Sequence, residues 1–163
     1  PPLKESPSRE YSLSPLIAGK RYTVTPVCLG SCSGVIFSFE PGKEKLREIS
    51  RGFRESKDDR IRGLQPVFVS VYSQDGFGVV PRFSGTVRDH SAAAAGGFVA
   101  GVVQGFLDRE ADGLCHGASF YLQWTQPSDM VYCTGTAEYA FYGTYYDDEE
   151  SETEEESEYG SDI

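Results

Sequence analysis

The side chains in this chain that could carry catalytic chemistry are its histidines and cysteines. They are His90, His116, Cys28, Cys32, Cys115 and Cys133. A thiol nucleophile needs a base held beside it. Cys115 and His116 are adjacent, so on a strand they would point to opposite faces and could not pair directly. A dyad could form only across space, from Cys28, Cys32 or Cys133 with either histidine, and nothing in the spacing indicates one. We therefore predict no catalytic residue and a protein that is not an enzyme.

The spacings required for metal, phosphate and sugar chemistry are also missing. The cysteine spacings C-x3-C and C-x17-C depart from the C-x2-C pairs typical of zinc sites. No phosphate-binding G-x-x-x-x-G-K-[ST] occurs. The isolated aspartates Asp75, Asp108, Asp112 and Asp129 fall in expected turns, where aspartate is favoured for backbone reasons. We predict neither a metal nor a cofactor.

The redox state of the cysteines bears on the compartment, which the sequence leaves open. The simplest interpretation is four buried free thiols that behave as small apolar groups, which would suit an intracellular protein. Two disulfides would instead indicate a secreted protein or a virion component. Residues 1–9 are polar and rich in proline, with no signal peptide.

Acidic residues are concentrated at the C-terminal end. Residues 147–163 hold ten of the 25 acidic side chains and no basic one, which leaves 15 acidic and 15 basic residues in 1–146. The net charge of −10 is therefore carried by this segment alone. We predict a leader over 1–9, one β-rich domain over 10–146 and a disordered acidic tail over 147–163.

This charge distribution favours a protein-binding domain whose tail steers or binds a basic protein partner. The carboxylates expected to make that contact are Asp147, Asp148, Glu149, Glu150, Glu154, Glu155 and Glu156. A tail of this charge would repel phosphates, which argues against nucleic acid as the partner.

Two further surfaces are candidates for binding. Tyr132, Tyr142 and Tyr146 are expected on one face of the last strand as an aromatic recognition surface. Arg47, Arg51 and Arg54 form a basic patch on an amphipathic helix, over which the acidic tail could fold back. Residues 43–62 carry eight basic and five acidic residues, so this stretch has a net charge of only +3.

Three alternative functions remain open at this stage. A projecting module of a viral capsid or another assembly would self-associate as a homo-oligomer. An intracellular chaperone of basic proteins such as histones would use the acidic tail. A hydrolytic enzyme ranks last, and it would need a polar, concave cluster around His90, His116 or a cysteine.

The hydrophobic pattern predicts a mainly β fold. Alternating runs such as 67–72 and 131–146, separated by turn signals such as Asp75-Gly76, predict an antiparallel β-sandwich or a partly open barrel of about 7–9 strands. Residues 98–107 could form a strand or a short buried helix, and their valines and flanking glycines favour the strand. The preceding alanines favour a helix, but Gly96-Gly97 would end it after barely a turn. One amphipathic α-helix is expected at about 43–57. No stretch of 18 apolar residues is present, so we expect no membrane span.

Overall fold

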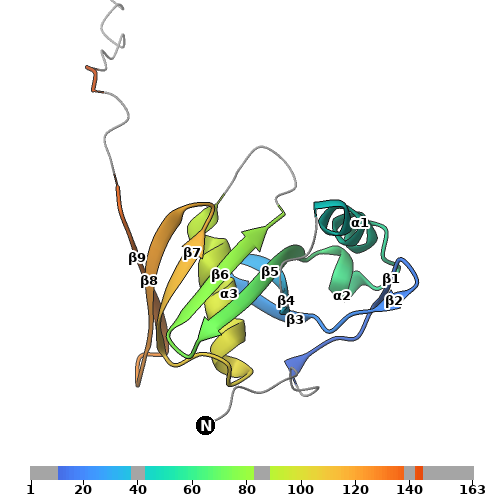
Figure 1. The fold of residues 1–163 in the computed structure, drawn as a ribbon, viewed down its shortest axis with the longest axis horizontal. Helices are drawn as coiled ribbons and strands as arrows, with labels where there is room; N and C mark the ends of the chain where they lie inside the picture. Colours follow the sequence, from blue (N-terminus) through green and yellow to red (C-terminus); the bar gives the residue numbers. More distant parts are fainter. Residues whose placement is uncertain (1–10, 38–42, 83–88, 138–141, 145–163) are drawn as a thin grey trace, which may run out of the picture.

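The computed structural model describes residues 11–37, 43–82, 89–137 and 142–144. Within these residues the chain forms nine strands and three helices (Figure 1). The strands are β1 (Leu16–Ile17), β2 (Lys20–Arg21), β3 (Thr25–Leu29), β4 (Ser31–Phe37), β5 (Gln65–Ser73), β6 (Gly76–Pro81), β7 (Glu110–Cys115), β8 (Ala118–Thr125) and β9 (Met130–Gly135). The helices are α1 (Lys43–Arg54), α2 (Asp59–Arg62) and α3 (His90–Val103). The predicted mainly β class is confirmed.

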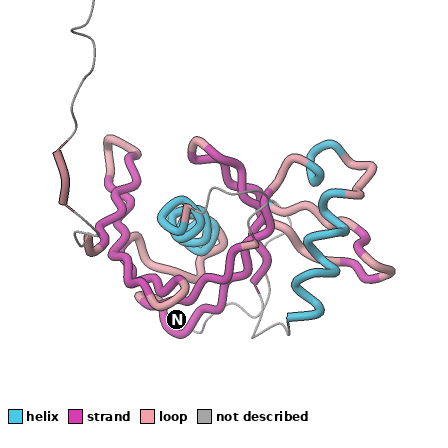
Figure 2. Tube along the Cα trace, turned by 90° about the horizontal axis from the view of Figure 1, so that it is seen from above, coloured by secondary structure: helices cyan, strands magenta, loops and turns pink. Residues whose placement is uncertain are grey.

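Seven strands form one sheet in the order β3-β4-β5-β6-β7-β8-β9, and β1 pairs with β2 in a small ribbon. The large sheet curls around α3, which Figure 2 shows nearly end-on within the curve. This confirms the partly open barrel, the second of the two predicted architectures. The sheet is mixed rather than wholly antiparallel, because β4 pairs with β5 and β6 pairs with β7 in parallel. Each parallel pair is joined by a helical crossover, as parallel pairing requires.

The central helix α3 is the element that the sequence analysis missed. It contacts all seven strands of the large sheet, and its Phe98 is fully buried. The expected strand over 98–107 is therefore wrong, and Gly96-Gly97 does not end the helix. A Cβ atom on Gly97 would lie 2.8 Å from Cγ2 of Val69. The glycine thus lets the helix approach the sheet closely, and packing compensates for its low helix propensity.

The strands at the middle of the sheet are buried on both faces. Val67 and Val69 of β5 belong to the core around α3, while Phe68 belongs to a second core beneath α1. Three residues of α1 complete this second core, namely Leu46, Ile49 and Phe53. The predicted amphipathic helix is confirmed, and it ends at Arg54 rather than near residue 57. Two-sided burial explains why β5 is an almost continuous apolar run.

The last strand is shorter than predicted. β9 ends at Gly135, and residues 136–137 and 142–144 are not in a strand. Residues 138–141 and 145–163 lie outside the described residues, as do residues 1–10, so the predicted domain boundaries stay a prediction.

The cysteines do not form the expected set of four buried thiols. Cys28 and Cys32 face each other across the β3–β4 hairpin and form a disulfide. Cys115 is a buried free thiol, and Cys133 is an exposed one.

None of the helices in the described part of the chain is both long enough and apolar enough to cross a bilayer.

Replacing Phe98 with alanine should destabilise the fold strongly, because this fully buried ring packs against Phe77 at a centroid distance of 6.3 Å. The expected loss in the free energy of unfolding is about 3–5 kcal/mol, measured by urea denaturation. Tyr142→Ala is the control, since this side chain is 95% exposed and its loss should change the free energy by less than about 0.5 kcal/mol. Equal effects of the two substitutions would contradict the central position of α3.

Candidate functional site

The amino-terminal end of α3 is capped by an ionised aspartate. Oδ1 of Asp89 accepts hydrogen bonds from the backbone N–H of Ala92 at 2.9 Å and from the hydroxyl of Ser91 at 2.7 Å. The backbone hydrogen bond from Ala92, followed by the one from Ser91, lowers the pKa of this carboxyl. An exposed negative charge is therefore held at the positive end of the helix dipole.

The turn between β7 and β8 brings a thiol and two imidazoles together at this end of α3. Cys115 is the last residue of β7, and the turn that follows contains His116 and Gly117 with φ of 49° and 82°. Nδ1 of His90 lies 3.5 Å from Sγ of Cys115. The rings of His90 and His116 meet edge to face, with centroids 5.2 Å apart. The half-buried His90 thus lies against the buried Cys115 and the exposed His116.

This geometry corrects the sequence argument about Cys115 and His116. That argument placed both residues on a strand, where neighbours point to opposite faces. His116 lies instead in a tight turn with left-handed backbone conformation, so the alternation ends at Cys115. The two side chains can therefore approach the same third residue, His90.

β9 contributes a second free thiol to the same region. Cys133 pairs with the buried Leu122 of β8, and Val131, two residues earlier, packs on the α3 core. Since alternate residues share a face, Cys133 points to the concave side of the sheet. Burial raises the pKa of the Cys133 thiol, and the negative charge of Asp89 raises it further. Asp89 and Cys133 are therefore close enough to interact electrostatically.

Both free thiols are protonated at neutral pH. Burial raises the pKa of Cys115 to about 11. A thiol needs to be a thiolate to act as a nucleophile or a metal ligand, so neither group is a ready nucleophile or metal ligand at neutral pH. No three or more His, Cys, Asp or Glu side chains of the described residues are arranged to hold a metal ion.

Three sets of residues were predicted from sequence as binding surfaces. The acidic residues 147–163 and Tyr146 are outside the described residues, so their contacts stay a prediction. Tyr132 and Tyr142 are exposed, at 51% and 95%. The arginines of α1 lie on the other side of the sheet from α3.

The cluster around His90 was not predicted, because its members come from three separate segments of the chain. Asp89 caps α3 and His90 is its first residue, Cys115 ends β7 and His116 begins the turn that follows, and Cys133 lies on β9. The one local signal is an aspartate three residues before the start of an alanine run, which is a helix N-cap pattern. The sequence analysis named a polar cluster around a histidine or cysteine as the feature that an enzyme would need.

Asp89→Ala should lower the free energy of unfolding at neutral pH by about 0.5–2 kcal/mol, the usual cost of losing a helix N-cap. The folded state lowers the pKa of Asp89. Its carboxylate therefore stabilises the fold above the ordinary aspartate pKa of about 3.9, and this contribution is lost as the pH falls through the lowered folded value. Asp89→Asn, which keeps a capping oxygen, is the control. Urea denaturation between neutral pH and pH 2 measures the difference, and a gap between wild type and D89A that widens on acidification would contradict it.

Thiol labelling should distinguish the cysteines. One thiol, Cys133, should react in the folded protein; two should react after unfolding, and all four after unfolding with reduction. The folded-state reaction should be slow at neutral pH and accelerate as pH rises, because the thiolate is the reactive form and the pKa of Cys133 is raised. Mass spectrometry counts the labels, and Cys133→Ser should leave none in the folded protein. Rapid labelling of Cys115 without unfolding would show that the site is more open than the structure indicates.

Comparison with known proteins finds a similarity to an enzyme. No known protein-family model matches the chain. The chain is 30% identical over 129 residues to a diaminopimelate epimerase from Nostoc punctiforme. The match covers 78% of this chain and 46% of that protein, so the chain spans about half the length of the relative.

This similarity overturns the function inferred from sequence. The sequence predicted a protein-binding domain that is not an enzyme and whose acidic tail steers a basic partner. Similarity to an epimerase contradicts that prediction. The capsid and chaperone alternatives fail for the same reason. The physical reason for the error is that the acidic segment dominated the net charge, while the reactive side chains were scattered along the sequence. The comparison favours the class that the sequence analysis ranked last, an enzyme.

Proposed function

We propose that this domain provides proton-transfer groups for an isomerase that inverts a stereocentre of an amino acid, with diaminopimelate as the first substrate to test. The proposal is supported by the similarity to a diaminopimelate epimerase. The observation that carries it is the contact of His90 with both Cys115 and His116 at the amino-terminal end of α3.

Inversion at a carbon next to a carboxyl group is acid–base chemistry. A base removes the proton from one face of the carbon, and the electron pair of the broken C–H bond is delocalised into the carboxyl group. A proton is then returned to the opposite face, so no oxidant or reductant is consumed. The reaction needs one proton-transfer group on each face, within hydrogen-bonding reach of the carbon's proton.

The side chains at the amino-terminal end of α3 would provide the proton-transfer group on one face of the substrate carbon. Imidazole is the side chain that most often gains and loses protons near neutral pH. In this proposal the exposed His116 and the half-buried His90 exchange the proton with the substrate. Cys133 is a second protonated group nearby. The buried Cys115 is a positioning residue, since it contacts Nδ1 of His90 from the core side.

The helix end does not itself attract an anionic group of the substrate. Its partial positive charge of about half an elementary charge is offset by the carboxylate of Asp89, which caps it. In this proposal the charge that develops on the substrate carboxyl group is stabilised by groups outside this cluster. Asp89 is a positioning residue in this scheme, because its carboxylate is engaged in capping the helix.

The proton-transfer group for the opposite face would come from outside the cluster. The matched region corresponds to 46% of the relative. We therefore propose that a second domain or a second copy of this chain completes the site, with the substrate between the two.

Deuterium exchange at the substrate carbon distinguishes proton transfer on one face of that carbon from proton transfer on both faces. The domain is incubated with diaminopimelate in deuterated buffer, and NMR follows the loss of the proton on the carbon next to the carboxyl group. Exchange needs one group, whereas inversion, measured by chiral chromatography, needs two. We expect His90→Gln and His116→Gln to lower the exchange rate about 10²–10⁴-fold, the usual contribution of an acid–base group.

The control is Tyr132→Phe on β9. Tyr132 is adjacent to Cys133 but points to the opposite side of the strand, so the exchange rate should not change. No exchange above buffer in the wild-type protein, or an equal loss in the Tyr132 variant, would contradict the proposal.

A further inference from the structure

A cavity lined by arginines lies on the α1 side of the sheet. Its volume is about 540 Å³, within the range of small-molecule sites. The basic residues that line it are Arg47, Arg51, Arg54, Arg62 and Arg82. Among the described residues, none that lines it is acidic. The cavity is separate from the cluster at α3, because its buried residue Phe53 belongs to the core beneath α1.

Three elements bring these arginines together. Arg47, Arg51 and Arg54 are spaced four and three residues apart, so they line one side of α1. Arg62 is the last residue of α2. Arg82 follows β6, and its backbone N–H donates to the carbonyl of Pro66 at 3.0 Å, which extends the β5–β6 ladder and fixes its position.

Only two of the five arginines are neutralised by described acidic residues. Arg51 pairs with Glu55 at 2.8 Å, and both side chains are largely exposed. Arg62 pairs with Asp59.

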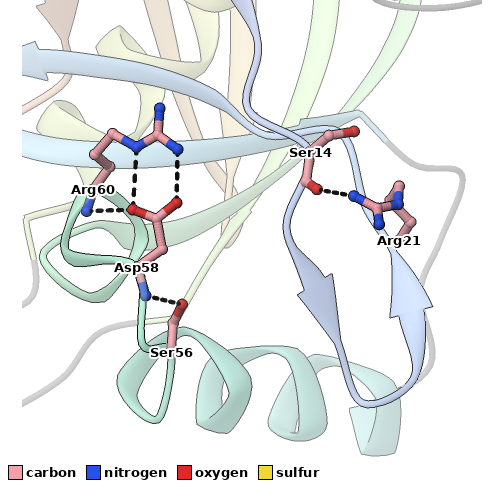
Figure 3. A network of polar contacts seen from close by, with 5 residues as sticks. All are labelled: Ser14, Arg21, Ser56, Asp58 and Arg60. Carbon is pink, nitrogen blue, oxygen red and sulfur yellow. Dashed lines mark hydrogen bonds and ion pairs between the residues drawn. The ribbon is translucent and has the colours of Figure 1, made fainter.

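The neighbouring Asp58 is already engaged elsewhere. Figure 3 shows its carboxylate bound to Arg60, with O···N distances of 2.9 and 3.1 Å. Arg47, Arg54 and Arg82 have no acidic partner among the side chains that the structure describes. The cavity thus holds a surplus of positive charge.

Such a surplus costs stability unless an anion offsets it. Like charges four residues apart on a helix repel each other, as Arg47 and Arg51 do here. Neutral donors and apolar surface also line the cavity, including Ser31, Phe53 and Leu64. A ligand that matches this lining has several anionic oxygens and a small apolar body.

We propose that this cavity binds a small molecule that carries two or more phosphate groups. Guanidinium groups bind phosphate oxygens in pairs, with a geometry that ammonium groups cannot reproduce. Each phosphate monoester carries about −1.5 to −2 charges at neutral pH, so two such groups offset the three arginines that have no acidic partner among the described side chains. This proposal is independent of the proton-transfer function, because it involves none of the residues at α3.

The test uses inorganic tripolyphosphate as the probe and the full chain, at constant ionic strength, with isothermal titration calorimetry as the measurement. We expect saturable binding and a rise in the melting temperature with probe concentration. Arg47→Gln and Arg54→Gln should each weaken binding about tenfold or more, as expected for loss of a hydrogen bond between charged groups. Arg47→Lys should give an intermediate loss, because the charge remains and the paired geometry is removed.

Lys57→Gln is the matched control. Lys57 is exposed in the connection between α1 and α2 and does not line the cavity, so its loss should weaken binding by less than about twofold. An equal loss in this variant would reveal general attraction to a positive surface and would overturn the proposal, as would the absence of saturable binding. Circular dichroism checks that each variant is folded.

Two further arms identify the source of the anionic groups. Citrate should bind at least about tenfold more weakly than tripolyphosphate, because its carboxylates carry one charge each; equal affinity would overturn the assignment to phosphate. The full-length variant Glu154→Gln, Glu155→Gln, Glu156→Gln should bind the probe as the wild type does. A tenfold or greater gain in that variant would show that the chain's own acidic residues fill the cavity, and would overturn a small-molecule ligand.

Discussion

The close packing of α3 inside the curled sheet is the constraint on which the rest of the structure depends. A helix enclosed by seven strands must present small side chains where the backbones approach each other. A Cβ atom on Gly97 would meet Val69 at 2.8 Å, and one on Gly113 would meet Phe77 at 2.7 Å. Glycine is thus needed on both the helix and the sheet. The large ring of Phe98 fills the remaining space and is fully buried.

The same packing decides where the reactive side chains lie. Because α3 is fixed within the sheet, its amino-terminal end is held beside the end of β7 and the concave face of β9. His90 and Cys115 are 25 residues apart in sequence but 3.5 Å apart in space. The core side of this cluster is apolar, which keeps the Cys115 thiol protonated. Its outer side is open, with His116 and Cys133 exposed. An apolar interior behind accessible imidazole groups supports the proposed acid–base chemistry, because it fixes the position of His90 while His116 stays exposed.

The parts of the fold that sequence could predict are those specified by local pattern. The stripe of Leu46, Ile49 and Phe53 identifies α1, and the Asp75-Gly76 turn identifies the β5–β6 hairpin. The helix α3 has no such pattern, because its apolar residues face the sheet on all sides and two adjacent glycines each cost about 1 kcal/mol in helix propensity. That cost is offset only by contacts with strands distant in sequence. The candidate site shares this property, since no pair of its residues except neighbours is linked by a local motif.

Net charge misled the functional interpretation for a related reason. A net charge summed over a stretch of sequence takes no account of where each side chain lies in space. Over residues 43–62 that sum is only +3. In space, Glu55, Asp58 and Asp59 are engaged with Arg51, Arg60 and Arg62. Arg82, which follows β6, also lines the cavity and contributes to none of these pairs. The neutral body therefore contains a concentrated positive cavity that a sequence sum conceals. Opposite charges that cancel in the total can still be separated by the fold, and the electrostatic potential that a ligand experiences depends on that separation.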